Sequence, residues 1–276
     1  MDISSDMIIT SASNDKVKAV KKLMKSASER RDTGTYVVEG IRMFREIPSC
    51  DIVSVFVAYG LADRFDEDIS DIPTDKLLYV KDNVFAGMAG TNSPQGIMAV
   101  VKMKKYKLQD ICGEGEKPFI LIADRIQDPG NMGTILRSAE AAGVTGIIIS
   151  RDTVDIYNPK VVRSTMGSIF RMKVYVSDDL CSDIDLLKKR KITIYGAHLD
   201  GEEIYRHSFD SSCAFLIGNE GNGLSSEVSA KADKLIRIPM EGQVESLNAA
   251  VSTAIISYEV LRQRKFKKSC HKCIHT

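Results

Sequence analysis

The fold class of this chain is decided by residues 119–150, which read FILIADRIQDPGNMGTILRSAEAAGVTGIIIS. An apolar run at 119–124 and another at 146–150 enclose a helix pattern at 131–143. Short runs of almost purely apolar residues are typical of strands that are buried on both faces, as parallel strands are. The stretch therefore predicts a strand, a crossover helix and a second strand parallel to the first.

The same alternation continues toward the C-terminus. Four more strands are predicted at 173–176, 192–197, 214–219 and 234–240. Four more helices are predicted at 158–170, 178–190, 224–232 and 246–264. Strands that alternate with helices indicate an α/β fold whose parallel sheet is covered on both faces.

A smaller α/β module precedes this region. The sequence predicts a basic helix at 15–32 with an apolar stripe, strands at 35–40, 52–60, 76–80 and 96–103, and a helix through 43–47. The polar stretch 104–118 contains two glycines and a proline, which favours a linker. We therefore expect a domain at 1–103, a linker at 104–118 and a second domain at 119–276.

Charge is distributed in blocks, although the formal net charge is only +1. Residues 16–31 hold seven Lys/Arg and one Glu, residues 51–71 hold six acidic residues and one Arg, and residues 262–272 hold six Lys/Arg and no acid. Separated basic blocks favour a face that binds a polyanion, whereas a solvated surface accounts for the same charges without any partner.

Targeting and cysteine patterns favour a cytoplasmic protein. The N-terminus has no basic region followed by an apolar run, and no apolar run reaches the roughly 18 residues of a membrane span. The six scattered cysteines are typical of reduced thiols. Cys270 and Cys273, with His271 and His275, make half a zinc site at most, so no metal is expected.

In parallel α/β sheets, ligands bind at the carboxyl ends of the strands. The first strand-end loop, ADRIQDPGNMG, lacks both the dinucleotide-binding glycine spacing and the Gly-Lys-Ser/Thr of a phosphate loop. As structure alone, Asn131 is the N-cap of the next helix and Arg137 is a surface charge. The loop alone does not decide between these roles and a role in a site.

Two further strand-end loops are rich in glycine and polar residues. GNEGNGL, residues 218–224, places Glu220 among three glycines that allow close approach of a ligand to the backbone. IPMEGQVESLNAA, residues 238–250, precedes the last helix, which Ser246 is expected to cap. The apolar stripe of that helix is expected to comprise Leu247, Val251, Ile255, Tyr258 and Leu261. Together the two loops indicate a cofactor cleft.

Three segments carry a family resemblance. Residues 122–144 (IADRIQDPGNMGTILRSAEAAGV), 216–228 (LIGNEGNGLSSEV) and 238–259 (IPMEGQVESLNAAVSTAIISYE) closely resemble the ordered motifs of the SpoU (TrmH-like) RNA ribose 2′-O-methyltransferases. Residues 30–47 and 89–101 are similar to the N-terminal substrate-binding module of that family, which has a ribosomal-protein-like α/β fold. The resemblance implies a trefoil knot in the C-terminal domain, which periodicity cannot reveal because threaded chains are rare.

The resemblance also implies a site for S-adenosylmethionine inside the knot, and a homodimer. The residues that would line the cofactor are Gly218, Asn219, Ile238, Met240 and Leu247. The catalytic neighbourhood would comprise Asn131, Arg137, Glu220, Ser246 and Asn248. Such an enzyme must hold a ribose hydroxyl in line with the methyl group and remove its proton, with no metal and no covalent intermediate.

The expected activity is 2′-O-methylation of RNA, with ribosomal RNA of the 23S type as the first candidate because an added RNA module suits a folded target. Transfer RNA is the alternative target, and methylation of a drug site on ribosomal RNA would use the same architecture. A non-catalytic RNA-binding assembly factor is the alternative from another class, and the intact Asn131, Arg137, Ser246 and Asn248 argue against it.

Overall fold

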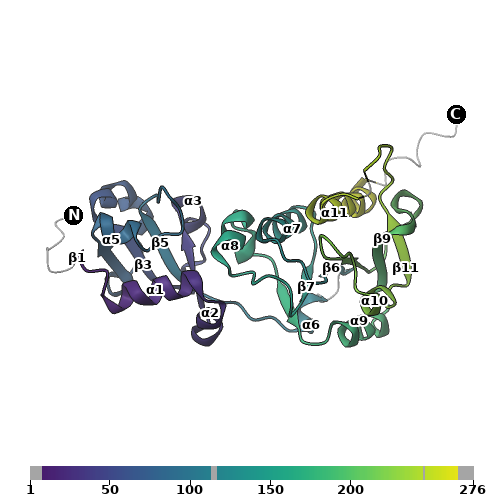
Figure 1. Cartoon of the computed structure of the whole chain (residues 1–276), viewed down its shortest axis with the longest axis horizontal. Helices are drawn as coiled ribbons and strands as arrows, with labels where there is room; N and C mark the ends of the chain where they lie inside the picture. Colours follow the sequence, from purple (N-terminus) through teal and green to yellow (C-terminus); the bar gives the residue numbers. More distant parts are fainter. Residues whose placement is uncertain (1–7, 113–116, 245, 267–276) are drawn as a thin grey trace. The chain divides into compact units, whose positions relative to one another are not determined.

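The computed structural model describes residues 8–112, 117–244 and 246–266. The chain forms two compact units, each with its own sheet (Figure 1). Unit 1 comprises Met1–Lys104 and Asp155–Phe170, and unit 2 comprises Lys105–Val154 and Arg171–Thr276. Unit 2 is therefore interrupted in sequence by a segment that folds with unit 1, which the sequence pattern did not predict.

Unit 2 is built on a six-stranded sheet in the order β11-β9-β10-β6-β7-β8. All of its neighbouring strands are parallel, which confirms the predicted α/β class. The central strands β6 and β10 are buried along their whole length, as their apolar runs predict. The strands are β6 (Phe119–Ala123), β7 (Gly146–Ser150), β8 (Val174–Ser177), β9 (Thr193–Glu203), β10 (Cys213–Ile217) and β11 (Lys234–Arg237).

Both faces of this sheet are covered. One face packs Ile120, Ile122 and Leu216 against apolar residues of α6, α9 and α10. The other face carries Phe119, over whose ring Arg264 of α11 lies, and α11 packs on α7. The helices are α6 (Leu108–Ile111), α7 (Pro129–Ala141), α9 (Leu180–Lys189), α10 (Ser226–Ser229) and α11 (Ala249–Phe266). No helix in the described part of the chain is long and apolar enough to cross a membrane.

The predicted core stripe of the last helix is wrong. Ile256 and Val260 are buried in α11, whereas Val251 is 47 % exposed and Tyr258 is 51 % exposed. Apolar residues occur on several sides of this helix, so periodicity alone could not identify the face that packs on the core. An apolar face therefore remains open to solvent.

The predicted linker is also partly structured. Residues 108–111 form α6, and Leu108, Ile111 and Cys112 are buried in the core of unit 2. Flanking glycines and charges gave the stretch the composition of a linker, although its apolar residues are needed to cover the sheet. The described part of 104–118 thus belongs mostly to unit 2.

The sheet of unit 1 has the order β1-β4-β3-β5-β2, in which β5 runs antiparallel to both of its neighbours. The predicted helix 15–32 is divided at Ser26, whose side chain caps the second half by accepting from Glu29 N. The strands are β1 (Ile8–Ile9), β2 (Thr35–Glu39), β3 (Ile52–Ala58), β4 (Leu77–Val80) and β5 (Ile97–Lys102). The α-helices of the N-terminal part are α1 (Asp15–Lys25), α2 (Ala27–Thr33), α3 (Ile41–Phe44), α4 (Asp66–Ile69) and α5 (Asp82–Ala86).

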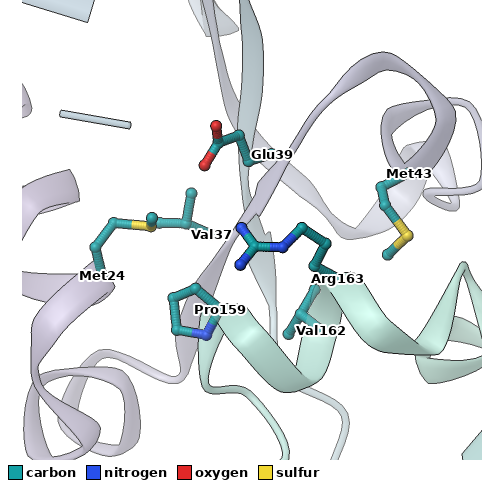
Figure 2. Close-up of a pocket in the computed structure, with 7 residues that line it drawn as sticks. All are labelled: Met24, Val37, Glu39, Met43, Pro159, Val162 and Arg163. Carbon is teal, nitrogen blue, oxygen red and sulfur yellow. The ribbon is translucent and has the colours of Figure 1, made fainter. Parts of the chain in front are cut away.

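The segment 155–170 completes unit 1 and contains α8 (Pro159–Thr165). α8 packs on β2, and Val161, Val162 and Thr165 are buried. Figure 2 shows the small cavity that α8 closes, lined by Met24, Val37, Glu39, Met43, Pro159, Val162 and Arg163. The predicted division placed this segment in the C-terminal domain. Its apolar residues instead pack against unit 1.

Candidate active site

A cavity of about 430 Å³ opens in unit 2 at the carboxyl ends of β10 and β11 and beside the middle of β9. Its walls come from residues within 197–199, 217–224, 236–240 and 246–256. Pockets that bind small molecules are mostly apolar and measure about 300–1,000 Å³. The cavity has this size, and it lies at the strand ends where a parallel sheet is expected to bind its ligand.

The loop after β10 is folded tightly against itself. Asn219 and Gly223 exchange both backbone hydrogen bonds, and the Asn219 side-chain oxygen accepts from Gly221 N at 3.0 Å and from Asn222 N at 3.1 Å. A Cβ atom at Gly218 would lie 2.2 Å from Gly223 C and Leu224 N. Only glycine therefore fits at 218, and the loop presents its backbone to the cavity.

The carboxylate of Glu220 connects this loop to the loop after β6, because it accepts hydrogen bonds from residues of that loop. Its Oε1 accepts from Asp128 N at 3.0 Å and from Asn131 Nδ2 at 2.9 Å, and its Oε2 accepts from Gln127 N at 3.1 Å. Burial alone would raise the pKa of Glu220, but these hydrogen bonds together hold it below its ordinary value. The group is therefore an ionised carboxylate that serves as an anchor for donors.

Asn131 extends this network to the last helix. Its Nδ2 donates to Glu220, and its Oδ1 accepts from Asn248 Nδ2 at 2.9 Å. The expectation that Asn131 caps α7 is wrong, because Asp128 is the N-cap and accepts from Asn131 N at 2.7 Å. The side chain of Asn131 is thus free of capping and joins two motifs that are far apart in sequence.

Asn248, and not Ser246, caps α11. The Asn248 Oδ1 atom accepts from Ala250 N at 2.9 Å and from Val251 N at 3.3 Å. Ser246 lies two residues before this cap, is exposed, and lines the cavity. The hydroxyl of Ser246 is consequently available to a ligand.

Arg137 lies on the exposed side of α7 and is not among the residues that line the cavity. Within the described part of the chain, no hydrogen bond or ion pair involves its guanidinium. The structure therefore brings together Asn131, Glu220 and Asn248, places Ser246 at the cavity, and leaves Arg137 outside this cluster.

Four of the five residues expected to hold a cofactor line the cavity, namely Gly218, Ile238, Met240 and Leu247. The fifth, Asn219, does not line the cavity. Its Nδ2 donates to Arg125 O at 2.7 Å, which ties the loop after β10 to the loop after β6.

One wall of the cavity was not predicted: it is formed by Ala197, His198 and Leu199, at the end of the predicted strand 192–197. The polar stretch AHLDG after that strand was the available signal.

The cavity suits a molecule with an apolar part and a polar part. Ile217, Leu224 and Ile238 supply apolar surface, while the Gly218–Gly223 loop supplies backbone groups. No group of three or more His, Cys, Asp or Glu with the arrangement of a metal site occurs among the described residues. The Cys270–His275 pattern lies outside them. The apolar side chains and backbone groups at the cavity fit an organic cofactor.

Two protein-family models match the chain. Residues 118–258 match the SpoU rRNA Methylase family, and residues 14–99 match the MRM3-like substrate binding domain. The two matches fall on either side of the predicted linker. They coincide with the segments whose motifs carry the resemblance seen in the sequence.

Characterised relatives cover almost the whole chain. The 23S rRNA (guanosine(2553)-2′-O)-methyltransferase RlmP of Bacillus subtilis (strain 168) is 35% identical over 91% of this chain and 98% of its own length. The AdoMet complex of the SpoU methyltransferase AviRb from Streptomyces viridochromogenes has a TM-score of 0.82 at 28% identity, over 91% of this chain and 98% of that one. The AdoMet-bound rRNA methyltransferase of Sinorhizobium meliloti has a TM-score of 0.78 at 26% identity, over 92% and 97%.

Proposed function

Because this chain belongs to the SpoU rRNA methylase family, we propose that it transfers a methyl group from S-adenosylmethionine to a ribose 2′-hydroxyl of RNA. The observation that carries the proposal is the hydrogen-bonded chain Glu220–Asn131–Asn248 beside the cavity. It joins one residue from each of the three motifs. A non-catalytic assembly factor would have no need to keep these three side chains in one connected network.

The cavity is the proposed cofactor site. Gly218, Ile238, Met240 and Leu247 would hold S-adenosylmethionine, with His198 and Leu199 completing the wall. Bound there, the cofactor supplies an electrophilic methyl group. The absence of a Cβ at Gly218 allows the loop 218–223 to close on its own backbone, and its glycines line the cavity, so recognition would depend on backbone groups more than on charged side chains.

The protein's own task in the reaction is positioning. The ribose oxygen forms a bond to the methyl carbon as the bond from sulfur to that carbon breaks, and the hydroxyl proton leaves. Arginine offers donors only and keeps its proton. We therefore assign Arg137 to a phosphate of the RNA, which fixes the hydroxyl in line with the methyl group while solvent takes the proton.

Ser246 and Asn248 would border the ribose. Ser246 lines the cavity and its hydroxyl has no hydrogen-bond partner among the described residues, while Asn248 is held rigid by the helix cap and by Asn131. Glu220 would act through Asn131, since its lone pairs are occupied by donors of the protein. Glu220 would thus have a positioning role although it lines the cavity, and contact with the ribose would fall to Ser246 and Asn248.

Ribosomal RNA of the 23S type is the proposed substrate. RlmP, which matches the chain over almost its full length, is a 23S rRNA methyltransferase. The exposed lysines of α1, including Lys16, Lys22 and Lys25, would contact phosphates of that RNA. Transfer RNA is the second candidate, because another relative at 34% identity is described as a TrmH family tRNA/rRNA methyltransferase.

Three further properties belong to the same proposal. A homodimer would cover the open face of α11 around Val251 and Tyr258. A trefoil knot in unit 2 belongs to the proposal because the resemblance to the SpoU family implies it. A cytoplasmic location agrees with the free thiols of the described cysteines.

The test is a methylation assay with the purified protein, labelled S-adenosylmethionine and ribosomal RNA from a strain that lacks the gene. We expect label at one ribose of the large-subunit RNA, located by mass spectrometry, and no label with RNA from the parent strain. Transfer RNA from the same strain is the parallel substrate. Label on transfer RNA alone would change the substrate assignment, and no label on any RNA would refute the activity.

A further inference from the structure

The turn at residues 150–154 holds the loop that follows β6. Arg125 N donates to Ser150 Oγ at 2.9 Å, Gln127 Nε2 donates to Asp152 O at 2.5 Å, and Val154 N donates to Ile126 O at 2.8 Å. Every residue of the loop from 125 to 127 is therefore hydrogen-bonded to this turn. These contacts lie within unit 2.

The same loop supplies the backbone donors of the candidate active site. Gln127 N and Asp128 N donate to Glu220. The loop begins at Arg125, whose φ of 57° lies in the left-handed region that costs free energy for a residue with a side chain. A loop that starts in a strained conformation depends on the contacts around it, and the turn 150–154 provides them.

The next residue, Asp155, is fixed within unit 1. Arg30 donates from Nε at 2.8 Å and from Nη2 at 2.6 Å to Asp155 Oδ2, and from Nη1 at 2.5 Å to Leu23 O. Arg30 is 2 % exposed, so it cannot reach an RNA phosphate as the lysines of α1 can. Burying a charged pair costs desolvation, and the gain in stability from such a pair is small.

Other contacts hold the residues that follow Asp155. The Tyr157 hydroxyl donates to Lys104 O at 2.9 Å, and the Tyr157 ring lies 4.6 Å from the buried Tyr36 ring. Pro159 and Val162 then pack around the cavity of Figure 2. The peptide bond from Val154 to Asp155 thus joins a turn that holds the active-site loop to a segment anchored on unit 1.

We propose that Arg30 is a positioning residue for methyl transfer, which acts by fixing Asp155 and, through the covalently attached turn 150–154, the backbone donors of Gln127 and Asp128 that hold Glu220. The proposal rests on the methyltransferase function proposed above. It gives the substrate-binding unit a role in turnover in addition to its role in RNA affinity.

The experiment compares the full-length protein with Arg30→Met and Asp155→Asn. Hydrogen exchange is followed in peptides that cover 124–131, together with S-adenosylmethionine affinity, RNA affinity and single-turnover rate. We expect exchange at 124–131 to rise and turnover to fall about tenfold, because small displacements of a positioning group are costly in rate. Both affinities should stay within about twofold of wild type, because neither binding surface contains Arg30.

Two further variants separate positioning from general destabilisation. Val20→Ala shortens a buried side chain of unit 1 in a core cluster that includes no residue of 155–170, and it should leave exchange at 124–131 and turnover near wild type. Gln127→Ala removes the bond to Asp152 O, so its loss of turnover should be non-additive with that of Arg30→Met. Asp155→Asn keeps an acceptor for Arg30 and serves if Arg30→Met does not fold.

Unchanged exchange and turnover in both Arg30→Met and Asp155→Asn would overturn the proposal. Equal losses in Val20→Ala would overturn it as well, since the effect would then be one of stability. The exchange measurement needs no RNA and no turnover. If the wild-type protein methylated no RNA, the proposed function would fail while the exchange result would still decide the role of Arg30.

Discussion

Replacing Glu220 with glutamine turns one carboxylate oxygen into an amide NH₂ group, although both oxygens accept hydrogen bonds in the structure. Oε1 accepts from Asp128 N and Asn131 Nδ2, while Oε2 accepts from Gln127 N at 3.1 Å and Asn219 Nδ2 at 3.4 Å. Glutamine retains one acceptor oxygen, so one pair of donors faces an NH₂ group. The less damaging orientation keeps the oxygen at Oε1 and sacrifices the Gln127 and Asn219 bonds.

The size of the effect follows from these bonds. A hydrogen bond to a charged acceptor is worth about 1.5–3 kcal/mol. The Asn219 contact is long and Glu220 is partly open to solvent, so we expect about 1.5–3 kcal/mol for the whole change. If the lost hydrogen-bond energy raises the activation free energy of methyl transfer by the same amount, because Asn131 and Asn248 are no longer held in place, turnover falls by about 10- to 100-fold.

The assay is single-turnover methyl transfer to RNA, with calorimetry for S-adenosylmethionine. Glu227→Gln is the matched control, because Glu227 is an exposed carboxylate on α10 and its substitution makes the same change in charge. Turnover of Glu220→Gln within about twofold of that control would refute a positioning role.

The pH dependence of stability provides an independent check on the ionised state of Glu220. Because its pKa in the folded protein is held below the ordinary value, its contribution to stability is present above the unfolded-state pKa of about 4.3 and is lost as pH falls through the lower folded value. Wild-type stability should therefore decline toward acid more steeply than that of Glu220→Gln, as measured by denaturant unfolding at a series of pH values.

Four other outcomes are expected. Arg137→Ala should lower turnover on the order of a hundredfold with little change in cofactor affinity. Arg137→Lys should restore little of that turnover, because an ammonium lacks the planar fork of a guanidinium. Normal turnover in Arg137→Ala would remove Arg137 from the mechanism. Reversing the charge of Lys22 and Lys25 should weaken RNA binding and reduce the salt slope by roughly two, measured by filter binding at several salt concentrations. Tyr258→Asp should yield a monomer by sedimentation, whereas an unchanged sedimentation coefficient would argue against the α11 interface. Gly218→Ala should abolish cofactor binding in calorimetry while the protein stays folded, because the added Cβ meets backbone at 2.2 Å.

The sheet of unit 2 could be predicted because strands that are buried on both faces consist almost entirely of apolar residues. All six strands of unit 2 lie where apolar runs predicted them, although β9 continues to Glu203, well beyond the predicted end at 197. That extension contains His198, Asp200 and Glu202, which no apolar pattern could reveal. It is held by pairing with β11, a contact that is set by tertiary structure.

The residues of the candidate site could be predicted from the sequence, but the helix caps beside them could not. The motifs identified Glu220, Asn131 and Asn248, which the structure connects. The caps were misassigned because Asp, Asn and Ser all serve as N-caps, and two such residues stand near the start of both α7 and α11. Only the backbone shows that Asp128 and Asn248 are the residues in the capping position.

The place of residues 155–170 in unit 1 has a consequence for synthesis on the ribosome. Until these residues emerge, Arg30 lacks its carboxylate partner and β2 lacks the cover of α8. Translation adds about 5–20 residues per second, so the chain from 105 to 170 takes roughly 3–13 s to make. During that interval the first three elements of the parallel sheet, β6, α7 and β7, are already being produced. The nascent chain cannot finish its first folding unit before it starts the second, and a chaperone that recognises exposed apolar surface would have β2 available to it for several seconds.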